Sequence, residues 1–204
     1  MTRNRRRVSA QLVAAVLLFG TSPALAQGSD WPCPQRLVPK LEPGQMWSGP
    51  ALDSVPATPD PAVAALSPKL MDLYAAPEAL TAEVKTFSDG LPAERREAAL
   101  AELFAVTLDR LNTDRATLIS GIKRYARGQR ALAEKVAAET RSLEALRQQP
   151  SPDPVQLDEL ETARTWDTRI FSDRQHSLRL VCDQPVLVEQ RAFALARIIQ
   201  EQLP

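Results

Sequence analysis

The longest uninterrupted helical pattern of the chain runs from Asp114 to Gln149 with no proline inside it, and it limits the fold more than any other feature. Proline is frequent elsewhere, with 17 in 204 residues. Apolar side chains recur here at every third or fourth position, and this spacing places them on one face of a helix. Only Gln129 and Thr140 interrupt the pattern, whose apolar members are Leu118, Ile122, Tyr125, Leu132, Val136, Leu143 and Leu146. The stretch therefore predicts a single helix about 54 Å long.

A second helix is predicted from about Pro154 to Cys182. Asp153 supplies an N-cap, Pro154 suits the first helical position, and Gln156 completes a capping box. The short connection at 150–153 makes the two helices antiparallel neighbours. The resulting register pairs apolar residues and puts Cys182 beside Gly121; the expected pairs are Leu146 with Leu157, Leu143 with Leu160, Leu132 with Phe171, and Tyr125 with Leu178.

The charge distribution supports this pairing. Residues 115–147 carry eight basic and three acidic side chains, whereas 153–183 and 78–111 each carry four basic and seven acidic ones. We therefore expect a basic helix between two acidic neighbours. Arg124, Arg127 and Arg130 then form a solvated face that pairs with the acidic helices, and an anion-binding strip is the alternative.

The remaining helices are predicted at 61–66, 68–75, 77–87, 92–111 and 186–202. Their limits come from prolines, from the capping cluster Asn112–Asp114, and from the break at Asp183–Pro185. Strand-like alternation is never longer than a few residues. The predicted fold class is all-α, a helical bundle with a long antiparallel hairpin at about 114–149 and 154–182.

The segment Trp31–Pro50 contains five prolines and two of the three tryptophans, so it cannot form a long helix, yet it is too apolar for a solvated linker. We expect this segment, here called the clasp segment, to lie extended on the helices. The only two cysteines, Cys33 and Cys182, predict a disulfide that ties it to the hairpin root. Closing such a long loop is worth about 5 kcal/mol in the chain-entropy model.

The first residues have the pattern of a signal peptide. Arg3 and Arg5–Arg7 precede the apolar stretch Leu12–Phe19, which is too short to cross a bilayer, and Ala24–Ala26 forms a cleavage site. We therefore predict periplasmic or secreted localisation and three parts: a cleaved signal peptide at 1–26, an extended proline-rich segment at 27–60, and one helical domain at 61–204.

The mature chain would hold 21 basic and 25 acidic side chains. This balance argues against nucleic acid as a partner. After signal cleavage we also expect no stable membrane insertion, because no later segment is long and apolar enough.

Catalytic chemistry has little support in the sequence. No phosphate-binding or dinucleotide motif occurs, no cofactor is implied, and no metal-ligand set is complete. The single histidine, His176, lies three residues after Asp173, a carboxylate placed to hydrogen-bond it on one helix face. An enzyme centred on His176 is the weakest of three hypotheses.

The leading hypothesis is a non-enzymatic protein that contacts another envelope or secreted protein, as an assembly factor, accessory subunit or chaperone-like binder. Its candidate contact residues are Trp31 and Trp47 in the clasp segment, and Gln149, Pro150 and Pro152 at the hairpin tip. The alternative is a small-ligand binder with a pocket at the hairpin root. The candidate pocket residues are Gly121, Gly128 and Trp166, with Trp47 beside them and Trp166 expected in the core.

Overall fold

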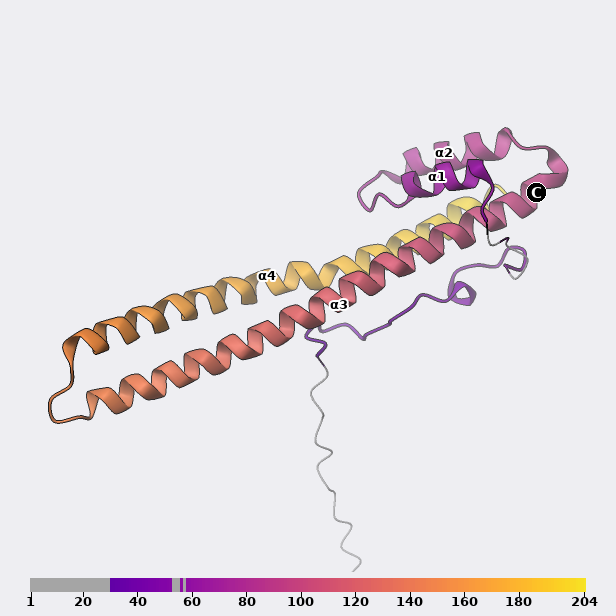
Figure 1. Ribbon diagram of the computed structural model, residues 1–204. Helices are drawn as coiled ribbons and strands as arrows, with labels where there is room; N and C mark the ends of the chain where they lie inside the picture. Colours follow the sequence, from indigo (N-terminus) through magenta and orange to yellow (C-terminus); the bar gives the residue numbers. More distant parts are fainter. Residues whose placement is uncertain (1–29, 53–55, 57) are drawn as a thin grey trace, which may run out of the picture.

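The computed structural model describes residues 30–52, 56 and 58–204, so the predicted signal peptide and its cleavage site lie outside the described residues. The fold is all-α, as predicted. Its elements are a 3₁₀ turn η1 (Pro43–Gln45) and the helices α1 (Pro61–Leu70), α2 (Pro77–Asp89), α3 (Ala93–Arg147) and α4 (Pro154–Gln200). Helices α3 and α4 form the predicted antiparallel hairpin (Figure 1).

Helix α3 is longer than predicted, because the expected boundary at Asn112–Asp114 is wrong. One helix runs through all three residues. Asn112 is buried and does not cap a helix; its side-chain amide accepts from the Leu41 N–H at 2.8 Å and donates to the Leu41 carbonyl at 3.1 Å. A distant backbone segment has therefore taken the hydrogen bonds that a local cap would make.

Helix α4 is also continuous, so the break predicted at Asp183–Pro185 is wrong. Pro185 lies inside the helix and removes the donor that would bond the Val181 carbonyl. Next to this defect, the Cys182 carbonyl accepts from Gln35 Nε2 at 2.5 Å, and the Pro185 carbonyl accepts from the guanidinium of Arg115. These tertiary hydrogen bonds hold the backbone in place around the proline.

The small helices differ from prediction in the same way. Helix α1 passes through Pro68, where two helices at 61–66 and 68–75 were expected, and it ends at Leu70. Its buried residues Val63, Leu66 and Leu70 pack on α3, while α2 packs on α4. Tertiary burial of this apolar face outweighs the local cost of the proline.

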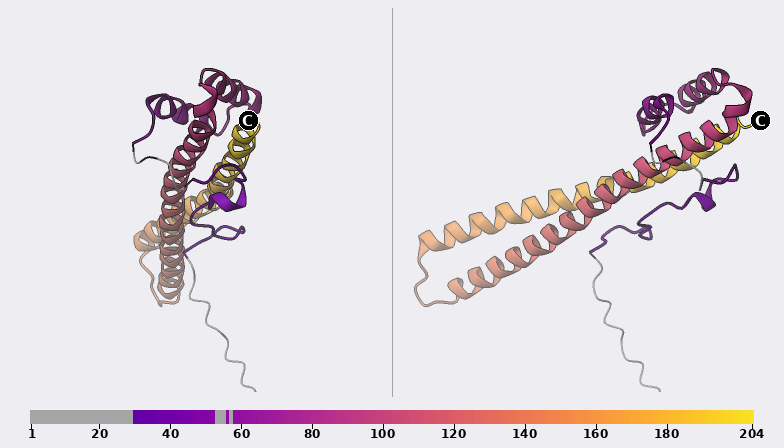
Figure 2. Two further views of the ribbon diagram at one scale, coloured as in Figure 1. Left: turned by 90° about the vertical axis from the view of Figure 1, so that its right-hand side faces the viewer. Right: turned by 45° about the vertical axis from the view of Figure 1, so that its right-hand side comes forward.

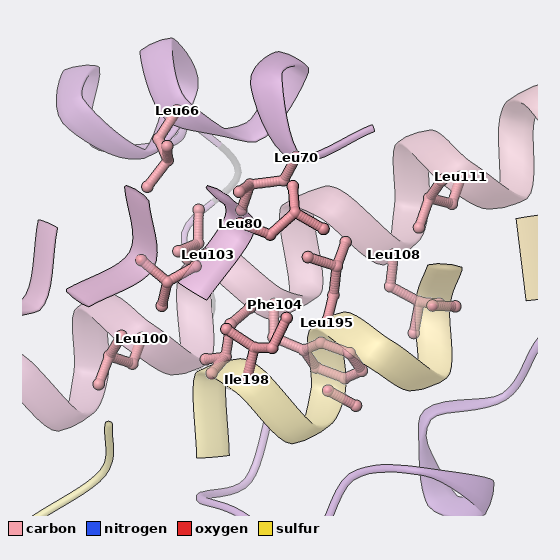
Figure 3. Packing of buried hydrophobic residues seen from close by; sticks show 14 of the residues in the cluster. Leu66, Leu70, Leu80, Leu100, Leu103, Phe104, Leu108, Leu111, Leu195 and Ile198 are labelled. Atoms are coloured by element: carbon pink, nitrogen blue, oxygen red, sulfur yellow. The ribbon is translucent and has the colours of Figure 1, made fainter. Parts of the chain in front are cut away.

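The main core lies at the end of the hairpin where the chain terminates, beneath α1 and α2 (Figure 3). Its largest fully buried members include Phe104, Leu100, Leu103, Leu195 and Ile199. A second, smaller cluster surrounds the disulfide and consists of Cys33, Ile122 and Cys182, with Trp31, Leu178 and Val181 against it.

Beyond the disulfide the hairpin projects away from the core, and its tip lies at the opposite end of the molecule from α1 and α2 (Figures 1 and 2). We call this part, residues 123–181, the arm. The 55 residues of α3 span about 82 Å at 1.5 Å per residue. Few arm side chains are buried: those of Ala126, Gln129, Leu143 and Asp167.

Candidate functional site

The clasp segment runs along the hairpin from the root of the arm to the core (Figure 1). The predicted disulfide between Cys33 and Cys182 is present, with Cα atoms 5.5 Å apart. Arg115, with a side chain only 4% exposed, donates through Nε to the Val38 carbonyl at 2.9 Å. Further along, the Ser48 N–H donates to Gln200 Oε1 at 2.7 Å. Covalent and polar links therefore fix the clasp segment over its whole length.

Both clasp tryptophans are half-buried against the helices. Trp47 stacks on Phe104 with ring centroids 4.4 Å apart, and its Nε1 donates to the Pro50 carbonyl at 2.8 Å. Gly49 permits this packing, because a Cβ there would lie 2.5 Å from the Trp47 ring. Trp31 Nε1 donates to the Gln35 carbonyl at 2.8 Å. These contacts explain why an apolar, proline-rich segment lies extended on the bundle.

The structure does not bring Gly121, Gly128, Trp47 and Trp166 together around one pocket. Trp47 contacts Phe104 in the main core, whereas Trp166 lies in the arm beside Asp167, which pairs with Lys135. The separation of positions 104 and 135 along α3 corresponds to about 46 Å. A Cβ on Gly128 would meet nothing within 4 Å, and one on Gly121 would meet only Arg124 at 3.9 Å, so neither glycine serves a close helix contact.

Trp166 is not a core residue as expected, because it is 63% exposed. Val155 and Leu180, on the same helix, are 63% and 70% exposed. At 3.6 residues per turn the three positions fall within an arc of about 40° on the outer face of α4. We call Val155, Trp166 and Leu180 the outer stripe. Sequence periodicity alone did not separate this stripe from the buried face of α4.

A groove of about 440 Å³ surrounds Trp166, and all of its lining residues come from α4: Asp158, Glu161, Thr162, Thr165, Trp166 and Arg169. The tryptophan ring thus stands among charged and hydroxyl side chains. The predicted tip residues lie farther out, with Gln149 and Pro150 exposed and Pro152 half-buried. The structure does not bring the tip residues and the clasp tryptophans together.

Charge pairs cross the arm between its two helices. Lys135 Nζ lies 2.5 Å from Asp167 Oδ2, and Arg147 pairs with Glu161. The adjacent ammonium of Lys135 holds the pKa of Asp167 below its usual value, and the Asp167 carboxylate raises the pKa of Lys135. Pairing of the basic helix with the acidic residues of α4 is therefore confirmed.

The other half of the charge prediction is wrong, because the acidic stretch 78–111 is not a separate neighbouring helix. It comprises α2 and the first part of α3 itself. Two of the three arginines of the proposed anion-binding strip, Arg127 and Arg130, instead pair with Asp30. Their hydrogen bonds, that of Arg127 first, lower the pKa of the Asp30 carboxyl.

His176 is exposed, and its Nδ1 lies 2.7 Å from the Ser172 carbonyl. Within the described part of the chain, no hydrogen bond joins it to Asp173 or to any other side chain. Over the same residues, no three histidine, cysteine, aspartate or glutamate side chains gather as a metal site would require.

No described helix combines the length and apolar character that a bilayer span needs. Comparisons with known protein families, with curated proteins and with solved structures found no match.

Proposed function

We propose that this chain is an exported, non-enzymatic helical protein that binds another envelope or secreted protein through the outer stripe of its arm. The observation that carries the proposal is the exposure of Trp166, 63% of whose surface is open to solvent on a projecting helix. Tryptophan is enriched among the residues that dominate binding energy at protein interfaces.

The surroundings of Trp166 support an interface centred on this ring. Val155 and Leu180 lie on the same face of α4, about 16 and 21 Å from Trp166 along the helix axis, and add further exposed apolar side chains to the arm. Asp158, Glu161 and Arg169 line the groove around the ring and would form a polar rim. An apolar centre with a polar rim is the usual anatomy of a non-obligate interface.

The separation of the molecule into a packed body and a projecting arm also supports a contact surface on the arm. The main core and the disulfide cluster lie at and behind the root of the arm, so the arm adds few buried apolar side chains to the fold. An element that adds little core and exposes large apolar residues suits contact with another molecule. The tip residues Gln149, Pro150 and Pro152 remain predicted contacts at the end of the same arm.

Export is supported by the disulfide between Cys33 and Cys182, because structural disulfides persist mainly in oxidising compartments. The partner would therefore be found in the envelope or outside the cell, where both proteins are folded and oxidised.

The test is site-specific photocrosslinking in the producing cells. A photoreactive residue replaces Thr162, which is exposed and lines the groove one turn from Trp166. A matched control replaces Glu78, which is exposed on α2 in the body of the protein. We expect a discrete adduct with one different protein from position 162 and none from position 78. Equal adducts from both positions, no adduct, or an adduct with the mass of two copies of this chain would contradict the proposal.

A further inference from the structure

A second groove, of about 650 Å³, lies between the clasp segment and the part of α4 that follows the disulfide. It is on the body of the protein and shares no lining residue with the groove around Trp166. Its volume is within the range of sites that hold small organic ligands.

One part of this groove is apolar. Trp31 and Val38 contribute from the clasp segment, and Val186 and Phe193 contribute from α4. Phe193 is 38% exposed, although its neighbours Ala192 and Leu195 are each only 1% exposed. The exposed ring of Phe193 and the other apolar residues of this groove offer an apolar surface for a ligand chain.

The charged part of the groove has an excess of guanidinium groups. Arg36, Arg115 and Arg197 line it together with a single carboxylate, that of Glu189. Arg115 is already engaged, since it bonds the Val38 and Pro185 carbonyls and lies 3.5 Å from Glu189. Arg36 and Arg197 are exposed and enter no ion pair with the residues that the structure describes. Two cations therefore remain without a charge partner beside an apolar surface.

From this combination we propose that the groove binds a single-chain monocarboxylate, a fatty acid. Its carboxylate binds the guanidinium of Arg197, one helical turn from Phe193, and its hydrocarbon chain lies along Phe193, Val186 and Val38. Guanidinium groups bind carboxylates through parallel, charge-assisted hydrogen bonds. The apolar side chains supply the remaining affinity by burying the hydrocarbon chain.

The groove is formed before any ligand binds, because both of its walls are fixed. The disulfide joins Cys33 to Cys182 immediately next to it. Gln35 donates to the Cys182 carbonyl at 2.5 Å, and Arg115 donates to the Val38 carbonyl at 2.9 Å. A preformed site avoids the cost of ordering its walls on binding.

The test is isothermal titration calorimetry of the purified, oxidised protein with decanoate and with the neutral alcohol decanol. The double variant Arg36→Gln/Arg197→Gln should weaken decanoate binding about tenfold or more, because two charge-assisted hydrogen bonds are lost. It should leave decanol binding unchanged. Phe193→Ser should weaken the binding of both ligands.

The matched control is Arg141→Gln/Arg174→Gln, which removes the same charge from exposed positions in the arm. It should bind decanoate as the wild type does. No heat of decanoate binding to the wild type overturns the proposal. An equal loss of decanoate affinity in the two double variants overturns the proposal as well, because the loss would then follow from the change in net charge and not from the groove. Circular dichroism melting of each variant checks that the fold is kept.

Discussion

At the scale of single residues, the side chain of Asn112 shows how the clasp segment is held. Its amide bonds both the N–H and the carbonyl of Leu41, and Leu41 is 1% exposed in the main core. One residue of α3 therefore satisfies both polar backbone groups of a buried residue that belongs to no helix or strand. Buried backbone groups without such partners are costly.

Replacing Asn112 by leucine tests this role. The change keeps the side-chain size but leaves the Leu41 N–H and carbonyl without partners, so we expect the free energy of unfolding to fall by about 2–4 kcal/mol. Urea denaturation followed by circular dichroism measures it. The adjacent exposed Thr113, changed to alanine, should shift stability by no more than about 0.5 kcal/mol. Equal stability of Asn112→Leu and wild type would refute the role.

Asn112 also marks what sequence reasoning missed at this scale. Asn-Thr-Asp is typical of a helix start, and that local preference predicted a boundary. The side chain instead found partners 71 positions away, which no local pattern reports. The disulfide, in contrast, was predictable from the sequence, because a chain with only two cysteines allows a single intramolecular pairing.

At the scale of elements, the hairpin was predictable and its continuity was not. The proline-free stretch and the turn at 150–153 indicated two antiparallel helices. Pro68 and Pro185 were expected to end helices, yet α1 and α4 continue through them. Packing on α3, and hydrogen bonds from Gln35 and Arg115 near Pro185, outweigh the local cost of the proline. Those partners become visible only once the chain is folded.

The outer stripe is a second feature at this scale that the sequence did not predict. Trp166 has the same helical spacing as the apolar residues of α4 that face α3, and this spacing predicted that its side chain would be buried. The apolar face of α4 is too wide for one neighbouring helix to cover, so Val155, Trp166 and Leu180 remain exposed. Their exposure follows from the arm having only two helices.

The pairing of the two arm helices should depend on pH through Lys135 and Asp167. The pKa of Asp167 lies below its ordinary value of 3.8 in the folded protein, so its ion pair stabilises the hairpin above that pH. This contribution is lost as the pH falls through the folded pKa. The pKa of Lys135 is raised in the folded protein, so the same ion pair also loses its stabilising effect at alkaline pH, as the pH rises through the folded pKa of Lys135.

We therefore expect Asp167→Asn to lower the urea midpoint at neutral pH, and the difference from wild type to shrink as the pH falls below 3.8 and through the lowered pKa of Asp167. Asp158→Asn, a change of an exposed carboxylate on the same helix, is the control and should show no such convergence. A difference for Asp167→Asn that stays constant across the acid range would contradict the assigned pair.

At the scale of the whole molecule, the disulfide separates a fixed body from a projecting arm. It joins residues 149 positions apart and holds the clasp segment across the root. The chain-entropy model assigns such a long loop about 5 kcal/mol. We expect Cys33→Ser/Cys182→Ser to unfold at lower urea, with a loss of about 2–5 kcal/mol.

The reduced wild-type protein is the matched comparison and should unfold with the same midpoint as the double serine variant. Intact mass before and after reduction confirms which form is measured. A loss below about 1 kcal/mol would show that the noncovalent contacts of the clasp segment suffice, and the disulfide would then have no main role in stability.

The exposed tryptophan of the arm is the centre of the proposed contact surface, and the yield of the photocrosslinked adduct from position 162 tests this role directly. Trp166→Ala should reduce that yield about tenfold or more, because truncating a central tryptophan removes a dominant contact. Tyr74→Ala, at an aromatic residue 78% exposed on the body, should leave the yield unchanged. An unchanged yield in Trp166→Ala, or equal losses in both variants, would contradict the claim that the outer stripe is the contact surface.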